Sequence, residues 1–283
     1  MADQGSHYGK RERGKSRQGI YVFTASGKFL ASINDLSADN VLQMLERGWE
    51  AWERLPDSEK AATAPSVEST HRWEDEYPRD GLVLNGISRD LRDASNVAGA
   101  DTTAGRLPRW NRDTAWFSKA ESQRLIPSDV SVGDEFEFPK VFVDRMARFH
   151  FVDLVKGQSE SYSGDEMAKS RILGKVTRTD GDRLFIDIHG TTAAQSKMQS
   201  RWSRGLKTRV VGNAIFDRQK NEFAEFEMVA IGERWGRTRF NGRQHQLETS
   251  SIGFVFGMAP RDADASIPGI IWAYDAPWIK GPD

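Results

Sequence analysis

Two histidine–aspartate pairs have the residue types that a metal ion or an acid–base reaction requires. His150 precedes Asp153 at the end of an apolar run, and Asp187 precedes His189 in a segment of strand-like composition. Imidazole nitrogens and carboxylate oxygens together suit zinc, iron or general acid–base catalysis. No two of the five histidines have H-x-x-x-H spacing, so the fold would have to bring the two pairs together. The four residues are the candidate ligands of a divalent metal, although Asp187 and His189 also fit the solvated face of a strand.

A second candidate site, for binding rather than catalysis, lies around the segment 110–117. It combines Asn111 and Asp113 with aromatic residues, and such a set could line a polar pocket. The alternative is a short helix capped by an Asn or Asp, whose last two aromatic residues enter the core. We take Trp110, Asn111, Asp113 and Arg145 as the candidate binding residues.

Several other chemistries are excluded by composition or lack their structural context. The chain of 283 residues has no cysteine, which removes disulfide exchange, thiolate nucleophiles and Cys-ligated zinc. The G-x-S-x-G and G-x-G-x-x-G motifs are absent. Residues 9–16 match the phosphate-loop pattern, but a polar segment precedes them and a strand-like segment follows, so we interpret residues 1–19 as a flexible basic tail. We therefore lean away from an enzyme.

The charge balance gives no general attraction to a polyanion. There are 40 Lys+Arg and 41 Asp+Glu, a formal charge of -1. Residues 234–243 interleave four arginines with aromatic residues, a composition compatible with single-stranded nucleic acid. With a nearly neutral chain we favour a solvated hairpin whose arginine stems cover apolar surface, so nucleic acid is not an expected partner. We expect no membrane span, and we expect a cytoplasmic location because the tail lacks the apolar core of a signal peptide.

The N-terminal elements should form a hairpin and a helix. Residues 20–24 and 29–33 are apolar and β-branched, and Gly27 lies in the turn between them. Ser37 precedes an apolar series at helical spacing that includes Leu45, Trp49 and Trp52, and Pro56 ends it. We expect this helix to lie against the hairpin, with both tryptophans as core anchors.

This order of strand, Ser-Gly-Lys turn, strand and capped helix resembles the C-terminal ββα part of the thioredoxin-like family over about residues 18–55. The segment 18–23 stands where that family has its cis-proline and following strand, but no proline precedes Ile20. The resemblance implies a thioredoxin-like remnant. It cannot imply a disulfide redox centre, because that chemistry requires a thiolate. A ββα appendage on an unrelated fold explains the same residues.

The rest of the chain predicts an α+β protein that ends in a β domain. We expect a ββα unit over residues 20–60, a charged linker over 61–80, and a mainly β domain over 81–283 with a helical N-terminal part. Residues 141–155 should be a helix passing into an extended segment. Two hairpins, at 172–190 and 209–231, and a strand at 250–258 indicate an antiparallel sandwich or a partly closed barrel.

These expectations favour a non-catalytic binding or structural protein. It would combine a redox-inactive thioredoxin-like remnant with a β-rich domain that binds an unknown ligand or protein. The alternative is a metal-assisted hydrolase that uses the four His and Asp residues named first.

Overall fold

A computed structural model describes residues 19–35, 37–61, 73–91, 110–196, 203–271 and 274. The chain divides into two compact units, Met1–His71 and Arg72–Asp283. The division falls within the stretch 61–80 that we assigned to a linker. The predicted tail, apart from Gly19, lies outside the described residues. Within the described part of the chain, no helix has both the length and the apolar character needed to cross a membrane.

The first unit is a two-stranded hairpin with a helix packed on it. Strands β1 (Ile20–Phe23) and β2 (Phe29–Ile33) pair antiparallel, and Gly27 has the positive φ, 83°, that its turn needs. Helix α1 (Ala38–Glu53) contacts the hairpin and is followed by the short helix α2 (Asp57–Lys60). Met44 and Gly48, one turn apart, are the buried residues of α1.

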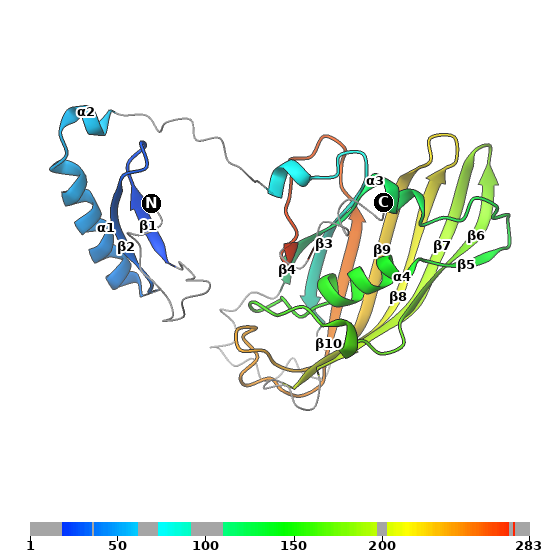
Figure 1. Ribbon diagram of the computed structural model, residues 1–283. Coiled ribbons are helices and arrows are strands. Elements are labelled where there is room, and N and C mark those ends of the chain that lie inside the picture. Colours follow the sequence, from blue (N-terminus) through cyan, green and yellow to red (C-terminus); the bar gives the residue numbers. More distant parts are fainter. Residues whose placement is uncertain are drawn as a thin grey trace. The chain divides into compact units, whose positions relative to one another are not determined.

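The second unit is built on one antiparallel sheet of eight strands (Figure 1). The spatial order is β4-β3-β10-β9-β8-β7-β6-β5. The predicted antiparallel β structure is confirmed, but among the described strands it forms one sheet that is not closed rather than a sandwich. The strands are β3 (Leu82–Asp90), β4 (Trp110–Phe117), β5 (Glu135–Glu137), β6 (Arg171–Asp180), β7 (Arg183–Gln195), β8 (Arg204–Asp217), β9 (Glu222–Gly236) and β10 (Ser250–Met258).

The strands follow the chain in order except at one place. From β5 to β10 each strand pairs with the next, so both predicted hairpins are confirmed. The β6–β7 turn has Gly181 at φ 56°. The exception is the pairing of β10 with β3, which joins the two ends of the unit.

A helical segment fills the inner face of this sheet. Helix α4 (Lys140–Arg145) continues into a π-helical turn, η4 (Met146–His150), and the chain then leaves helical structure, as the sequence predicts. The π-helical turn contacts both β4 and β7, which are five positions apart in the sheet, so the sheet curls around it. The core beneath is rich in phenylalanine, including Phe142, Phe226 and Phe254.

The segment 110–117 differs from the short capped helix that we considered. It is strand β4, paired along its whole length with β3. Its last residues, Trp116 and Phe117, are buried, so the expected core placement of these aromatics is confirmed. Pairing with the apolar strand β3 decided the backbone conformation, and the local Asn and Asp signals carry no information about that distant partner.

Candidate functional site

Asp113, His150 and Tyr274 form a buried chain of hydrogen bonds that links β4, the π-helical turn and the C-terminal segment. Nδ1 of His150 lies 2.7 Å from Oδ2 of Asp113, and Nε2 is hydrogen-bonded to the Tyr274 hydroxyl. With Asp113 accepting the Nδ1 proton, the other nitrogen accepts from the tyrosine. Burial raises the pKa of Tyr274 well above its ordinary value. The tyrosine therefore keeps its proton, which it can donate to Nε2 when the imidazole is neutral with its proton on Nδ1.

Arg145 lies beside this chain of hydrogen bonds, and its positive charge is balanced by the carboxylate of Glu121. The guanidinium contacts both carboxylate oxygens of Glu121, which comes from helix α3 (Lys119–Gln123), and both side chains are at most 2% exposed. Its central carbon, Cζ, lies 4.8 Å from the ring centre of Phe117 and 5.0 Å from that of Tyr274. Glu121 also accepts the backbone N–H of Ser118 at 2.8 Å, which caps α3.

These contacts fasten the C-terminal segment to the sheet. Besides Tyr274, the backbone N–H of Gly269 donates to Asp113 at 3.2 Å, and the indole of Trp116 donates to the carbonyl of Ser266 at 2.9 Å. The imidazole of His150 is fully buried. Because these groups are closed to solvent and bonded to one another, they hold a segment of this chain rather than an outside ligand. Sequence reasoning named Asp113, Arg145 and His150 but missed Tyr274, for which no motif gives a signal.

The other predicted site residues lie elsewhere. Trp110 is 52% exposed on β4, with the Arg112 guanidinium 5.6 Å from its ring centre, and Asn111 beside it is half-buried. On β7, Asp187 is exposed, and Nε2 of His189 lies 3.5 Å from a carboxylate oxygen of Glu135.

The structure does not assemble the four proposed metal ligands. His150 and Asp153 are each bonded to a different partner, and Asp187 and His189 lie on the strand face opposite the core. Among the described residues, no three His, Asp or Glu side chains are placed to hold a metal ion. The sequence of the two histidine–aspartate pairs does not indicate on which side of the sheet their side chains lie.

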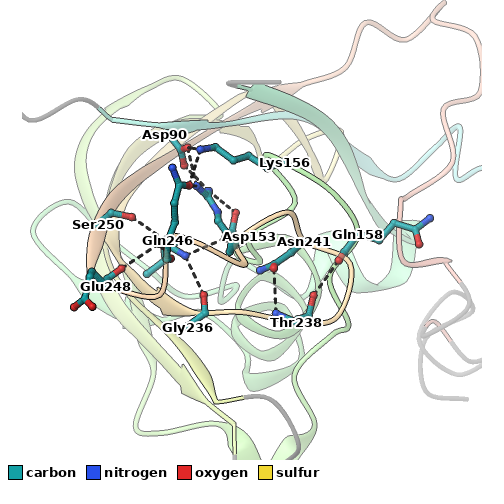
Figure 2. Close-up of polar contacts among 12 residues, drawn as sticks. Asp90, Asp153, Lys156, Gln158, Gly236, Thr238, Asn241, Gln246, Glu248 and Ser250 are labelled. Atoms are coloured by element: carbon teal, nitrogen blue, oxygen red, sulfur yellow. Dashed lines mark hydrogen bonds and ion pairs between the residues drawn. The ribbon is translucent and has the colours of Figure 1, made fainter. Parts of the chain in front are cut away.

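Asp153 belongs to a second buried network, centred on Arg243. Figure 2 labels Asp90, Asp153 and Gln246, which accept from this arginine. The guanidinium makes one bidentate pair with Asp153, both bonds 2.9 Å long, and another with Asp90, at 2.6 and 2.9 Å. Its remaining N–H donates to Gln246 at 2.9 Å, so all five donors are used. Burial opposes the charge, but the hydrogen bonds and charges of the two carboxylates hold the pKa of Arg243 above its ordinary value.

Lys156 and Arg234 extend this network over the end of the sheet. Burial and the charge of Arg243 lower the pKa of Lys156, whose ammonium donates to Gln246 at 2.6 Å. Arg234 donates to Ser250 at 2.7 Å and to the carbonyls of Gly236 and Glu248, both at 3.0 Å, and so holds the loop that joins β9 to β10. Figure 2 labels these three acceptor residues.

The solvated hairpin expected at residues 234–243 is therefore wrong for Arg234 and Arg243, whereas Arg239 and Phe240 are exposed. Arg234 and Arg243 are 2% and 1% exposed. Asp90 and Asp153 lie far away in the sequence and supply the counter-charges that permit the burial. The segment 234–243 contains the arginines but not their acidic partners. The burial of the arginines therefore could not be inferred from that segment alone. A cavity of about 340 Å³ opens beside the loop, but the Arg243 donors that line it are already occupied.

The first unit carries an apolar groove between α1 and the hairpin. Its volume is about 670 Å³, and it is lined by Val22, Phe23, Leu30, Leu45, Glu46, Gly48, Trp49, Glu50 and Trp52. Trp49 is 61% exposed and Leu45 45% exposed, and Trp52 is only half-buried. Neither tryptophan is therefore the core anchor that we expected. The indole centres of Trp49 and Trp52 lie 5.2 Å apart, which makes a continuous aromatic wall.

The groove exists because the helix turns a different face to the hairpin from the one we expected. Met44 and Gly48 face the strands, and a Cβ on Gly48 would already touch Val22 at 3.3 Å. Leu45 and Trp49 follow these residues by one position, which places them about 100° around the helix. The sequence did contain a signal for this groove. Helix α1 has more apolar residues than two short strands can cover, so some of them must stay exposed.

Comparisons with known proteins give no relative of this chain. No protein-family model matches it, and no curated protein or solved structure was found to be similar to it.

Proposed function

We propose that this chain is a non-catalytic binding protein whose first unit holds an apolar helix of a partner protein in the groove of α1 and the hairpin. The observation that carries the proposal is the exposure of Trp49, 61%, in an apolar groove of about 670 Å³. Exposed apolar surface of this kind marks interaction sites. The order of β1, β2 and α1 suits a thioredoxin-like remnant, and without cysteine such a remnant has a binding role rather than a redox one.

The spacing of the groove residues favours a helical occupant. Leu45, Trp49 and Trp52 line the groove at positions i, i+4 and i+7 of α1, so they extend along it for about 10 Å, or two turns. An amphipathic helix presents anchors with the same period, and such a helix lies in a hydrophobic groove with its apolar face down.

The charges of the groove favour a basic occupant. Among the described residues that line the groove, the charged ones are Glu46 and Glu50. Lys60 is not in the lining, and its ammonium lies 4.9 Å from the ring centre of Trp52. Glu50 pairs with Arg54 at 3.1 Å, but both side chains are well exposed, and an exposed pair of this kind contributes only about 0–1 kcal/mol. A partner with Lys or Arg beside its apolar face can therefore displace Arg54.

Trp49 should dominate the affinity. Covering the exposed three-fifths of an indole removes on the order of 100 Å² from water, which corresponds to about 2.5 kcal/mol at about 25 cal/mol per Å². A loss of that size weakens binding by roughly fiftyfold.

The test titrates the full chain with two synthetic helical peptides, one of leucine and lysine and one of leucine and glutamate, by fluorescence anisotropy. We expect the lysine peptide to bind wild type and to bind Trp49→Ala roughly fiftyfold more weakly. The matched control is Trp110→Ala, which removes a comparably exposed tryptophan, 52%, from β4 and should leave binding unchanged. Equal binding by wild type and Trp49→Ala would refute the groove as the site.

A second pair of measurements tests the charge of the occupant. Glu46→Gln combined with Glu50→Gln should reduce the preference for the lysine peptide, because it removes both carboxylates of the lining. If the glutamate peptide binds wild type as tightly as the lysine peptide does, the partner is not basic.

A further inference from the structure

The outer face of the eight-stranded sheet carries an apolar stripe that crosses four adjacent strands. Cross-strand pairing aligns one residue from each of β3, β10, β9 and β8, and a fifth lies next to them on β9. The members of this outer stripe are Ile87, Val255, Val229, Val211 and Ile231. Four of them are about half exposed, at 49% for Ile87, 53% for Val255, 45% for Val211 and 55% for Ile231.

Charges of opposite sign flank the outer stripe on its two sides. On the four strands of the stripe, Arg89 and Arg209 lie two residues away along the strands in one direction, and Glu227 lies two residues away in the other. Asp187 continues the row of Glu227 on β7, where it pairs with Lys175 of β6. The two arginines and the two acidic residues are all exposed. Arg209 and Glu227 are four residues apart along their paired strands, or about 13 Å, so they do not neutralise each other within one chain.

The stripe and the charges nearest to it are self-complementary under one two-fold rotation. Turning a second copy about an axis parallel to the outer stripe lays stripe on stripe and places each arginine row opposite the acidic row of the other copy. An axis parallel to the strands would instead place arginine opposite arginine. Because an isologous dimer uses the same patch on both subunits, only a self-complementary patch can form one.

We propose that the outer stripe is the interface of a homodimer in which two sheets pack face to face about a two-fold axis along the stripe. The strands of the two copies then run nearly parallel or antiparallel to each other, which is the aligned class of sheet packing, with the sheets about 10 Å apart. The sheet curls around its helix, so the contact centres on β3, β10, β9 and β8 and opens towards β4 and β6. This assembly is independent of the groove on α1.

Sedimentation equilibrium of the full chain over a wide concentration range tests the interface. Wild type should be dimeric at the upper end, and Val255→Glu should raise the dissociation constant by about tenfold or more, because it places a carboxylate in the apolar contact. The control is Val132→Glu, since Val132 is also 53% exposed but lies in the turn before β5. A monomer at every concentration overturns the proposal, and so does an equal effect of the two substitutions.

A charge exchange tests the direction of the axis. Arg209→Glu alone and Glu227→Arg alone should each weaken the dimer, because each places like charges opposite one another. The two substitutions together restore opposite charges and should return the dissociation constant towards the wild-type value. An additive loss in the double variant would overturn the arrangement. Circular dichroism confirms that each variant folds, and Trp49→Ala should dimerise as wild type does, which separates this proposal from the proposed function.

Discussion

Replacing Glu121 by glutamine removes the counter-charge of a completely buried arginine. Arg145 is 0% exposed and Glu121 2% exposed, so the remaining guanidinium cannot be solvated without opening the core. Breaking one partner of a buried pair costs about 3–5 kcal/mol. Glutamine keeps an oxygen that can cap Ser118, so the loss of charge rather than the loss of the cap is what the substitution measures.

Urea unfolding followed by circular dichroism of the sheet measures this cost. We expect the free energy of unfolding of the second unit to fall by about 3–5 kcal/mol, which for a unit of this size lowers Tm by roughly 6–20 °C. Arg145→Met should cost a similar amount. The double variant should cost less than the sum of the two, because it buries no uncompensated charge.

The matched control is Glu137→Gln. Glu137 pairs with Arg171 at 2.9 Å, but both side chains are about half exposed, so the same chemical change should cost no more than about 1 kcal/mol. The reasoning is refuted if Glu121→Gln costs as little as this control, or if the two single effects add fully in the double variant.

Three further perturbations test the buried polar groups and one close backbone approach. Tyr274→Phe leaves a nitrogen of His150 without its partner, and calorimetry should show a loss of about 1–3 kcal/mol. Burial would raise the pKa of Asp90, but the guanidinium of Arg243 and the ammonium of Lys156 hold that pKa below its ordinary value. The ionised carboxylate therefore stabilises the fold above about pH 4, and this stabilisation is lost as the pH falls through the folded-state pKa. In an acid titration, the free energy of unfolding of Asp90→Asn should fall less steeply than that of wild type. Gly205→Ala places a Cβ 1.9 Å from the ring of Trp235, and thermal unfolding should show a loss of about 1–3 kcal/mol, with no loss contradicting the placement of that ring.

The elements that could be predicted are those whose information is local. The hairpin of β6 and β7 follows from two apolar runs and a glycine turn, and the helix at α4 from its spacing of apolar residues. The single open sheet could not be predicted, because its order depends on the pairing of β3 with β10, and no local pattern encodes that choice. The capped-helix alternative at β4 failed for the same reason.

The candidate sites divide in a similar way. Asp113, Arg145 and His150 were singled out by residue type, and the structure places them around Tyr274, where burial gives them a structural task. The tryptophans of α1 indicate an apolar surface, but the groove is exposed only because the small hairpin covers so little of that surface. Ion pairs between residues far apart in the sequence, such as Arg243 and Asp90, cannot be predicted from local sequence patterns.

The pairing of β10 with β3 also has a consequence for how the second unit forms. From β5 to β10 each strand finds its partner by a short search, and β3 finds β4 in the same way, whereas the β10–β3 pairing joins residues such as Phe256 and Gly86 across most of the unit. Loop-closure entropy makes that pairing the slow event. We expect pulse-labelled hydrogen exchange to protect β6 to β9 first and, last, the β3 amides that bond to β10. The contact of Arg243 and Asp90 then reports that the sheet is complete.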